Sequence, residues 1–490
     1  ADGLIAYPKM LMNQFPGSVS QSNAFFYDGV AKLVYRFNPK SQVSLSYYRS
    51  YDIFKFPGDT SYAWRSNILA LNGKWQLSRL LSLHYAANTS YYASDINGNL
   101  SHYEFKLRSS IKHTEAKADL HYQAANHLYF EGGYDFIRYS LSSGELSPAK
   151  TGSAINPMSL RKEFGDQMAG YLLGRLDITK QISLEAGIRR SDFFYRGPNT
   201  VYQYAAGLPL STETISDSTA YARGKTITHY GGWEPRILLK IGIDRSTSFK
   251  MSYVKMRQYL QLVSNTTAIT PVDFWKLSDP LIKPATADQF TAGVFRNFSN
   301  DKVETSLEGF YKHSTDLIDY KDGATLLMNP YVDAGLLAAE GRSYGVELNL
   351  RKTKGIITGQ LSYTWSRSFI ADRTDFKSEE IDGGAFYPSA YDRPSNLSVT
   401  GGVKLGLGWD FGWTFVYITG RPATYPDGTY RINNSVVTVY SVRNYDRLPD
   451  YNRLYISFSH DSRLYAKHKE YCIINFSLYN IYAKKNPYSI

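Results

Sequence analysis

The sequence predicts an all-β protein that folds as a transmembrane antiparallel up-and-down β-barrel, with residues 1–490 in one domain. Three observations predict this class. Apolar and polar residues alternate along most of the chain, the alternating segments are long, and short connections alternate with long ones. For example, Ile182, Leu184 and Ile188 alternate with Glu185 and Arg189. Because successive side chains of a strand point to opposite faces, such a segment has one apolar and one polar face.

The alternating segments number about eighteen, and many reach about ten residues, enough to cross a bilayer at a tilt. Strands of soluble proteins average about five or six residues. We expect 100–124 to be one continuous strand although residues 112–115 are polar, because a turn there would break the alternation of short and long connections. In chain order the predicted strands are 24–37, 42–54, 64–76, 81–93, 100–124, 127–141, 167–178, 181–195, 230–242, 248–260, 288–297, 303–319, 343–352, 356–369, 393–406, 409–420, 451–460 and 469–480.

The connections between these strands fall into two kinds. Short ones are expected at 38–41, 77–80, 125–126, 179–180, 243–247, 298–302, 353–355 and 407–408. Long ones are expected at 142–166, 196–229, 261–287, 320–342, 370–392 and 421–450. A barrel with tight turns at one end and long loops at the other produces this alternation. A soluble sandwich does not, and the repeat of about 40–50 residues that marks a β-propeller is missing.

The faces of the strands follow from hydrocarbon outside the barrel and water inside. We expect Ile182, Leu184, Ile188, Leu348 and Leu350 to contact lipid, and Glu185, Arg189, Glu347 and Arg351 to face the lumen. Aromatic clusters are expected to form the girdle at the membrane boundary, and they include Tyr47, Tyr51, Phe193, Phe194, Tyr195 and Trp365.

The composition agrees with this class. Aromatic residues make up 15%, including 42 Tyr, and no run of about 18 apolar residues predicts a transmembrane helix. The net charge of +11 is spread along the chain, which argues against a nucleic-acid partner and suits anionic lipopolysaccharide or an anionic ligand. A single cysteine, Cys472, excludes an internal disulfide framework.

No catalytic constellation is found, so we expect neither an enzyme nor a cofactor. The motifs of zinc peptidases, serine hydrolases and paired-cysteine metal sites are missing. Glu304 and Glu308 share a strand face, but about 13 Å separates them, more than either glycosidase spacing. An acidic stretch is interpreted as a solvated outer loop, with bound calcium as the alternative; its carboxylates are Asp372, Asp375, Glu379, Glu380 and Asp382.

Several segments, taken in order, resemble the barrel of a TonB-dependent receptor, of the Bacteroidetes type that carries a carboxypeptidase-regulatory-like domain before its plug. They are AFFYDGVAKL at 24–33, DFW at 273–275, SDP at 278–280, IKP at 282–284, GRSYGVEL at 341–348, LSYTWSRS at 361–368, YDRP at 391–394, TGRP at 419–422, YNRL at 451–454, LYNIY at 478–482 and KNPY at 485–488. The chain departs from the family at Pro394 and Ser395, where a basic residue and His are usual.

The resemblance implies an outer-membrane receptor in which a ligand binds among the outer loops and a plug couples to TonB. The implied partners are outer-membrane lipids, lipopolysaccharide, TonB, a surface lipoprotein and a small ligand, which is a glycan, siderophore, vitamin or peptide. The candidate ligand contacts are Trp275, Tyr320, Tyr387, Tyr391 and Arg393. A passive porin and a surface-adhesion barrel are the alternatives.

The resemblance also implies that the barrel is partial. The segments that would form the plug and the TonB box are not found, and family members have about 22 strands. We therefore expect the strands at 24–37 and 469–480 each to have one free edge.

Overall fold

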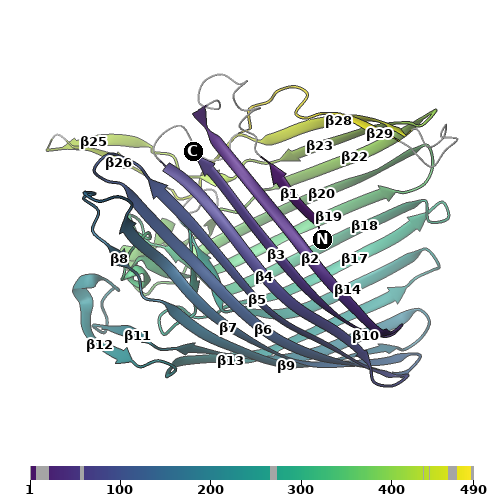
Figure 1. Ribbon diagram of the computed structural model, residues 1–490, viewed down its shortest axis with the longest axis horizontal. Coiled ribbons are helices and arrows are strands. Elements are labelled where there is room, and N and C mark those ends of the chain that lie inside the picture. Colours follow the sequence, from purple (N-terminus) through teal and green to yellow (C-terminus); the bar gives the residue numbers. More distant parts are fainter. Residues whose placement is uncertain are drawn as a thin grey trace.

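The computed structural model describes residues 2–6, 21–55, 60–264, 273–433, 435–440, 442–461 and 472–486. Its main feature is one antiparallel sheet of 21 strands in which neighbours in space follow one another in the chain. The sheet curls round, so that the strands of its near and far sides cross in projection (Figure 1). The predicted all-β, up-and-down architecture is confirmed.

Each predicted strand corresponds to one strand of this sheet. The wall strands are β1 (Asp2–Ala6), β2 (Asn23–Asn38), β3 (Ser41–Lys55), β4 (Thr60–Gln76), β5 (Leu81–Gly98), β6 (Phe105–Ala125), β7 (Leu128–Pro148), β9 (Glu163–Asp177), β10 (Ile182–Arg196), β13 (Thr226–Gly242), β14 (Thr247–Gln258), β17 (Ala285–Phe298), β18 (Val303–Tyr320), β19 (Leu336–Lys352), β20 (Ile357–Asp372), β22 (Ser395–Gly406), β23 (Trp409–Ile418), β28 (Tyr451–Asp461) and β29 (Ile473–Leu478). The short strands β8 (Met158–Ser159) and β21 (Tyr387–Pro388) also belong to the sheet.

In the described ranges, the connections contain four separate two-stranded ladders and four 3-10 turns. The ladders are β11 (Asn199–Tyr204) with β12 (Ile215–Tyr221), β15 (Leu260–Val263) with β16 (Phe274–Leu277), β24 (Pro422–Ala423) with β27 (Asp446–Arg447), and β25 (Gly428–Ile432) with β26 (Ser435–Val439). The turns are η1 (Thr212–Thr214), η2 (Val332–Gly335), η3 (Lys377–Glu379) and η4 (Ile381–Gly384). No helix in the described ranges has the length and apolar character needed to cross a membrane.

The two edges of the sheet correct one prediction. β1, which the sequence analysis missed, pairs with β2 from Asp2↔Val30 to Ala6↔Phe26, so the predicted free edge at 24–37 is wrong over this stretch. With five residues, β1 is too short for an alternating pattern to stand out. β29 pairs with β28, and within the described ranges no ladder joins β29 to β1 or β2. Residues 469–471 of the last predicted strand lie outside those ranges.

The predicted continuity of the strand at 100–124 is confirmed. β6 runs unbroken through residues 112–115 and pairs there with both β5 and β7. It begins at Phe105 instead of residue 100 because a turn precedes it, in which the Tyr103 amide donates to the Leu100 carbonyl and His102 has a φ of 67°.

Short and long connections lie at opposite ends of the wall, as predicted. The tight turns, such as 126–127 between β6 and β7, face the right of Figure 1, and the loops that carry β8, β11, β12, β25 and β26 extend to the left. We call the left end the long-loop end. In an outer-membrane barrel this end is extracellular.

β10 identifies the lumen face of the wall. Ser191, Phe193 and Tyr195 are fully buried on one face, where they meet the inward-folded segment that carries Tyr259. The opposite face carries Ile188, which is 45% exposed. Exposed apolar residues on the outside and buried polar residues on the inside are the pattern expected of a wall in lipid.

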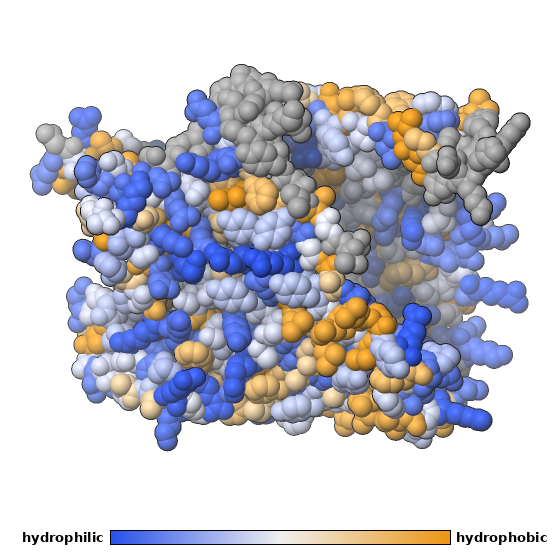
Figure 2. Space-filling view, viewed as in Figure 1, coloured by the Kyte–Doolittle hydropathy of each residue, from blue (hydrophilic) through white to orange (hydrophobic). Residues whose placement is uncertain are grey.

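The strand register extends the assignment of lumen-facing and outward-facing residues from β10 to the other strands, because directly paired residues point to the same face. Followed from β10 through β13, β14, β17 and β18, it places Glu347 and Arg351 of β19 in the lumen. Leu348 and Leu350 then point outward, with 40% and 43% of their surface exposed. The predicted faces are confirmed on both strands. Figure 2 shows hydrophobic residues gathered over the short-turn part of the near wall.

An aromatic belt marks the outer surface toward the long-loop end. Tyr253, Phe290, Tyr311, Tyr344 and Trp365 point outward from β14, β17, β18, β19 and β20, which are consecutive in the wall. The rings of Tyr253 and Phe290 lie 4.8 Å apart, and those of Tyr344 and Trp365 lie 6.1 Å apart. This position suits a membrane–water boundary.

One predicted girdle cluster is wrong. Phe193 and Tyr195 point into the lumen and are almost fully buried, and only Phe194 between them faces outward. The three residues are adjacent in sequence, so a strand must divide them between its two faces.

Candidate functional site at the long-loop mouth

The β15–β16 hairpin folds into the mouth of the barrel from the connection between β14 and β17. It contacts the wall strands β7 and β9, and the Ser143 hydroxyl donates to the Trp275 carbonyl at 3.2 Å. The hairpin therefore narrows the lumen beside these strands. This long connection was predicted as a loop, and its inward fold was not.

An apolar cluster holds the base of the hairpin against the wall. Leu141, Phe193 and Tyr195 of the wall pack with Tyr259 and Leu277. The rings of Phe193 and Tyr259 stack 4.9 Å apart at 10°. This close approach needs a glycine on β9, because a Cβ at Gly165 would lie 2.6 Å from the Phe193 ring.

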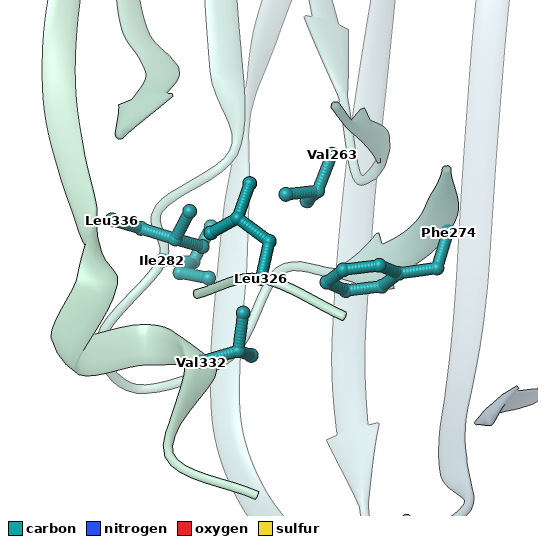
Figure 3. Packing of buried hydrophobic residues seen from close by; sticks show 6 residues of the cluster. All are labelled: Val263, Phe274, Ile282, Leu326, Val332 and Leu336. Carbon is teal, nitrogen blue, oxygen red and sulfur yellow. The ribbon is translucent and has the colours of Figure 1, made fainter. Parts of the chain in front are cut away.

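A second apolar cluster joins the hairpin to the connection between β18 and β19 (Figure 3). Its members come from four separate stretches of the chain, and each is less than a tenth exposed: Val263, Phe274, Ile282, Leu326, Val332 and Leu336. Their burial stabilises each loop by contact with the others, so the loops of the mouth form one packed unit.

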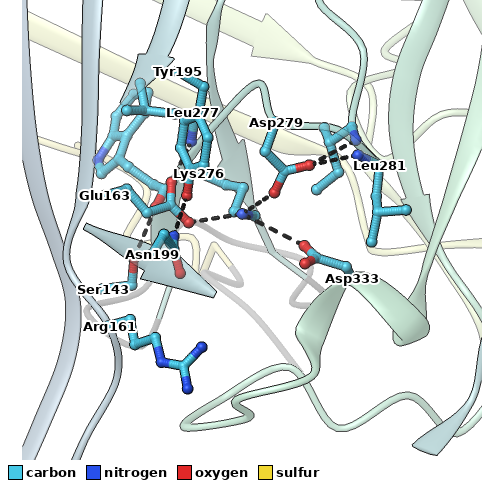
Figure 4. Close-up of polar contacts among 12 residues, drawn as sticks. Ser143, Arg161, Glu163, Tyr195, Asn199, Lys276, Leu277, Asp279, Leu281 and Asp333 are labelled. Atoms are coloured by element: carbon cyan, nitrogen blue, oxygen red, sulfur yellow. Dashed lines mark hydrogen bonds and ion pairs between the residues drawn. The ribbon is translucent and has the colours of Figure 1, made fainter. Parts of the chain in front are cut away.

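A buried ion network lies beside these clusters (Figure 4). The Lys276 ammonium, whose side chain is 5% exposed, contacts Glu163 at 2.7 Å, Asp279 at 2.5 Å and Asp333 at 3.4 Å. Glu163 also accepts a hydrogen bond from the Leu277 amide at 2.9 Å. One cation thus holds three carboxylates, which come from β9, the hairpin's own connection and η2.

The excess of carboxylates sets the protonation of the network. Burial and the neighbouring Asp279 raise the pKa of Asp333 to about 7, against the effect of Lys276. Burial lowers the pKa of Lys276, but Asp279, Asp333 and Glu163 together raise it well above its ordinary value. Lys276 is therefore charged at neutral pH, and Asp333 carries a proton part of the time.

A second polar cluster centres on Arg443. Its guanidinium donates to Asp319 at 3.2 Å and to the Tyr320 carbonyl at 2.8 Å, contacts Asp322, and lies 4.5 Å from the centre of the Tyr320 ring. The Tyr387 hydroxyl donates to the other oxygen of Asp319. Burial and the charge of Asp319 raise the pKa of Tyr387 well above its ordinary value. This cluster joins β18, β21 and the connection before β28.

Two of the cavities at the mouth border the β15–β16 hairpin. One of about 420 Å³ lies between the hairpin and strands β5–β7, with Ser90, Tyr92, Ser94, Leu141, Leu262 and Trp275 in its lining. The other, of about 280 Å³, borders the ion network and is lined by Arg161, Asn199, Tyr202, Lys276 and Asp333 among others. The larger cavity has the size of a small-molecule site, with aromatic rings and hydroxyl groups in its wall.

The five predicted ligand contacts fall in different places. Trp275 lines the larger cavity, whereas Tyr320 and Tyr387 meet around Asp319 and Arg443. Tyr391 is 70% exposed on a loop. Arg393 is half-buried, and burial together with nearby Arg421 lowers the pKa of Arg393. Of the five, Trp275 is the one that lines either of the two cavities described above, and the role of all five stays a prediction.

Sequence reasoning missed Lys276, Glu163, Asp333 and the part that Arg443 plays. Lys276 directly follows the DFW segment, which carries part of the family resemblance, but the sequence does not indicate its ion-pair partners. Glu163 lies 113 positions away from Lys276, and no spacing in the sequence links them. A pairing of this kind becomes visible only once the wall has curled.

The acidic loop has a structural role in the described residues. Asp372 accepts from the Ile381 amide at 3.0 Å, Asp382 accepts from the Arg443 amide at 3.2 Å, and Glu379 contacts Lys321 at 2.5 Å. Over the described residues, no group of three or more His, Cys, Asp or Glu side chains is arranged to hold a metal ion.

The curled, outward-apolar wall and the inward-folded loops define a large outer-membrane barrel with a constricted mouth. Residues 12–481 match the family described as TonB dependent receptor-like, beta-barrel, and the chain belongs to that family. It is therefore an outer-membrane receptor barrel of nutrient uptake and not an enzyme. The family match confirms the expected class, a TonB-dependent receptor, and the expected location in the outer membrane. It favours this class over the two alternatives, a passive porin and a surface-adhesion barrel.

Solved structures show the same fold. The copper transporter OprC superposes with a TM-score of 0.64 at 11% identity, over 95% of this chain and 67% of that one. The ferric-catecholate import receptor Fiu from K12 E. coli gives 0.63 at 12%, over 96% and 72%. P. aeruginosa FpvA, bound to a heterologous pyoverdine, gives 0.64 at 11%, over 94% and 61%. The chain thus spans 61–72% of these proteins. No curated protein matches it.

Proposed function

We propose that this receptor takes up a small ligand that first binds at the long-loop mouth, in the cavity between Trp275 and the wall. The observation that carries the proposal is the inward-folded hairpin, which places Trp275 opposite Tyr92 and the hydroxyls of Ser90 and Ser94 around about 420 Å³. Rings that offer their faces, together with small hydroxyls, suit a ligand with an apolar or ring-shaped surface. The lining also contains the carboxylate of Asp273, which disfavours an anionic ligand.

In this proposal the ligand then passes into the lumen, and a plug coupled to TonB drives its release. We also propose that the whole protein is a receptor of the Bacteroidetes type, with a carboxypeptidase-regulatory-like domain. In this proposal further strands lie beside β1 and β29, and a surface lipoprotein is a partner. The resemblance described above supports these features. The outer edges of β1 and β29, to which no ladder is joined in the described ranges, support the further strands, because each unpaired backbone group in lipid costs several kcal/mol.

The test is a ligand screen on the purified full-length protein. Glycans, ferric siderophores, vitamins and peptides are titrated against it, with quenching of tryptophan fluorescence as the readout. We expect one class to bind, and Trp275→Ala to weaken that binding by about tenfold to a hundredfold, the effect of losing one stacked ring.

Trp233→Ala is the matched control, because Trp233 points outward and is 56% exposed. It removes an equal ring from the same protein and should leave the affinity unchanged. Unchanged binding in Trp275→Ala, or an equal loss in both variants, would contradict the assignment of the cavity. Siderophore binding would give this chain the class of ligand for which the solved ferric import receptors are named.

A further inference from the structure

The β15–β16 hairpin separates two cavities of different chemical character. Side chains alternate between the two faces of β16, so Trp275 lines the larger cavity, whereas Phe274 and Lys276 line the smaller one of about 280 Å³. The proposed uptake of a ligand uses the larger cavity. The smaller cavity contains charged groups that this function leaves without a role.

Carboxylates outnumber cations in the buried part of the smaller cavity, where Lys276 holds Glu163, Asp279 and Asp333. Glu163 and Asp279 also accept hydrogen bonds from backbone amides at 2.9 Å. Asp333 differs from them. Among the described residues its one ion-pair partner is Lys276, at 3.4 Å, and its Oδ1 atom is buried and accepts no hydrogen bond. Asp333 is therefore the carboxylate that a further cation would stabilise most.

A guanidinium group lines the same cavity without a carboxylate partner. Arg161 is exposed just before β9, donates to the Thr200 carbonyl at 3.4 Å, and lies 5.7 Å from the centre of the Tyr202 ring. In the described parts of the chain it forms no ion pair. Figure 4 shows Arg161 at the lower left of the ion network and Asp333 at its right. The cavity thus offers an anionic group at one place and a cationic group at another.

Much of the uncharged lining is apolar. Phe274 and Val332 are each less than a tenth exposed, and Val201 and Leu281 add further aliphatic surface. An apolar substituent that covers these side chains gains free energy because it leaves water. The volume of about 280 Å³ is at the small end of the range for ligand sites. The cavity therefore suits a small molecule that has both charges and an apolar side chain.

We propose that the smaller cavity binds a small zwitterion with an apolar side chain, of the kind represented by a free amino acid. The ammonium group of the ligand pairs with Asp333. Its carboxylate pairs with the guanidinium of Arg161, a group that binds carboxylates in paired, charge-assisted hydrogen bonds. The cavity lies on the opposite face of the hairpin from Trp275, so the inference does not depend on the ligand proposed for the larger cavity.

The experiment is isothermal titration calorimetry on the purified full-length protein, with three related probes. Leucine carries both charges, leucinamide lacks the carboxylate, and N-acetylleucine lacks the ammonium group. We expect leucine to bind at least about tenfold more tightly than either of the other two, because each of them loses one charge-assisted hydrogen bond. Alanine and phenylalanine extend the series to a smaller and a larger side chain.

Two variants assign each charge of the probe to one residue. In Arg161→Gln, leucine should lose its advantage over leucinamide and keep its advantage over N-acetylleucine. In Asp333→Asn, leucine should lose its advantage over N-acetylleucine and keep its advantage over leucinamide. A general loosening of the mouth would weaken all three probes alike, so this crossed pattern separates binding from a structural role.

Matched controls remove the same groups elsewhere on the long loops. Arg223→Gln and Asp217→Asn each remove an exposed charge that is not part of the cavity lining. Both variants should bind the three probes as the unaltered protein does. Circular dichroism confirms that all four variants are folded.

Three outcomes would overturn the proposal. The first is that alanine, leucine and phenylalanine all fail to bind at millimolar concentration. The second is equal affinity for leucine, leucinamide and N-acetylleucine. The third is an equal loss of leucine binding in Arg161→Gln and Arg223→Gln.

Discussion

Replacing Lys276 by methionine should release the loops of the mouth and leave the wall intact. The side chain is 5% exposed and holds Glu163, Asp279 and Asp333. Removing the one cation leaves buried carboxylates without compensation, a change that costs about 3–5 kcal/mol. At about 3 kcal/mol, the population of the open loop rises roughly a hundredfold.

Hydrogen exchange followed by mass spectrometry measures this opening for each segment. In Lys276→Met, exchange should accelerate about a hundredfold in β15–β16 and not in β4–β5, which supplies none of the ion-pair partners that the described residues give Lys276. Lys255→Met is the matched control, because its single pair with Asp288 is about a third exposed and such pairs contribute at most about 1 kcal/mol. Equal protection of the hairpin in Lys276→Met and in the unaltered protein would refute the reasoning.

Three further predictions concern the wall and the loops. Leu348→Arg should cost about 2–4 kcal/mol near the bilayer midplane and Glu347→Gln about 0.5 kcal/mol or less, as measured by unfolding from lipid vesicles; similar costs would contradict the assigned faces. The pKa of Asp333 rises from 3.8 to about 7 on folding, so the folded loop keeps a proton that the unfolded chain releases. Loop protection should therefore fall from about pH 4 to about pH 7, and Asp333→Asn should abolish this slope; a slope that persists would assign it to another group. Tyr387→Phe should destabilise the Arg443 cluster by about 1.5–3 kcal/mol and Arg443→Met by about 3–5 kcal/mol, and thermal unfolding that ranks them in the opposite order would count against the cluster.

The wall could be predicted from the sequence because its signal is local. A period of two residues is visible within each strand. Apolar Leu348 next to charged Glu347 already indicates which face of the strand meets lipid and which meets the water of the lumen. Strand ends were less certain, and the five-residue β1 was missed because so few residues give no pattern.

The mouth could not be predicted in the same way, because its contacts join distant residues. The pairing of Lys276 with Glu163 and that of Arg443 with Asp319, 124 positions apart, have no spacing signature. Phe193 and Tyr195 look like membrane aromatics in sequence, and only the inward hairpin explains why they are buried.

The meander order of the wall has a consequence for how the protein folds. Nearly every ladder joins strands that are consecutive in the chain, so the wall can grow one hairpin at a time without threading any segment. The contact between Lys276 and Glu163 is different, since it spans 113 positions and needs β9 and β10 already in place. Closing so long a loop is entropically costly until the intervening strands have shortened it. The mouth is therefore the last part to form. Slow steps in refolding should change the fluorescence of Trp275, whereas strand formation in the wall should already be complete.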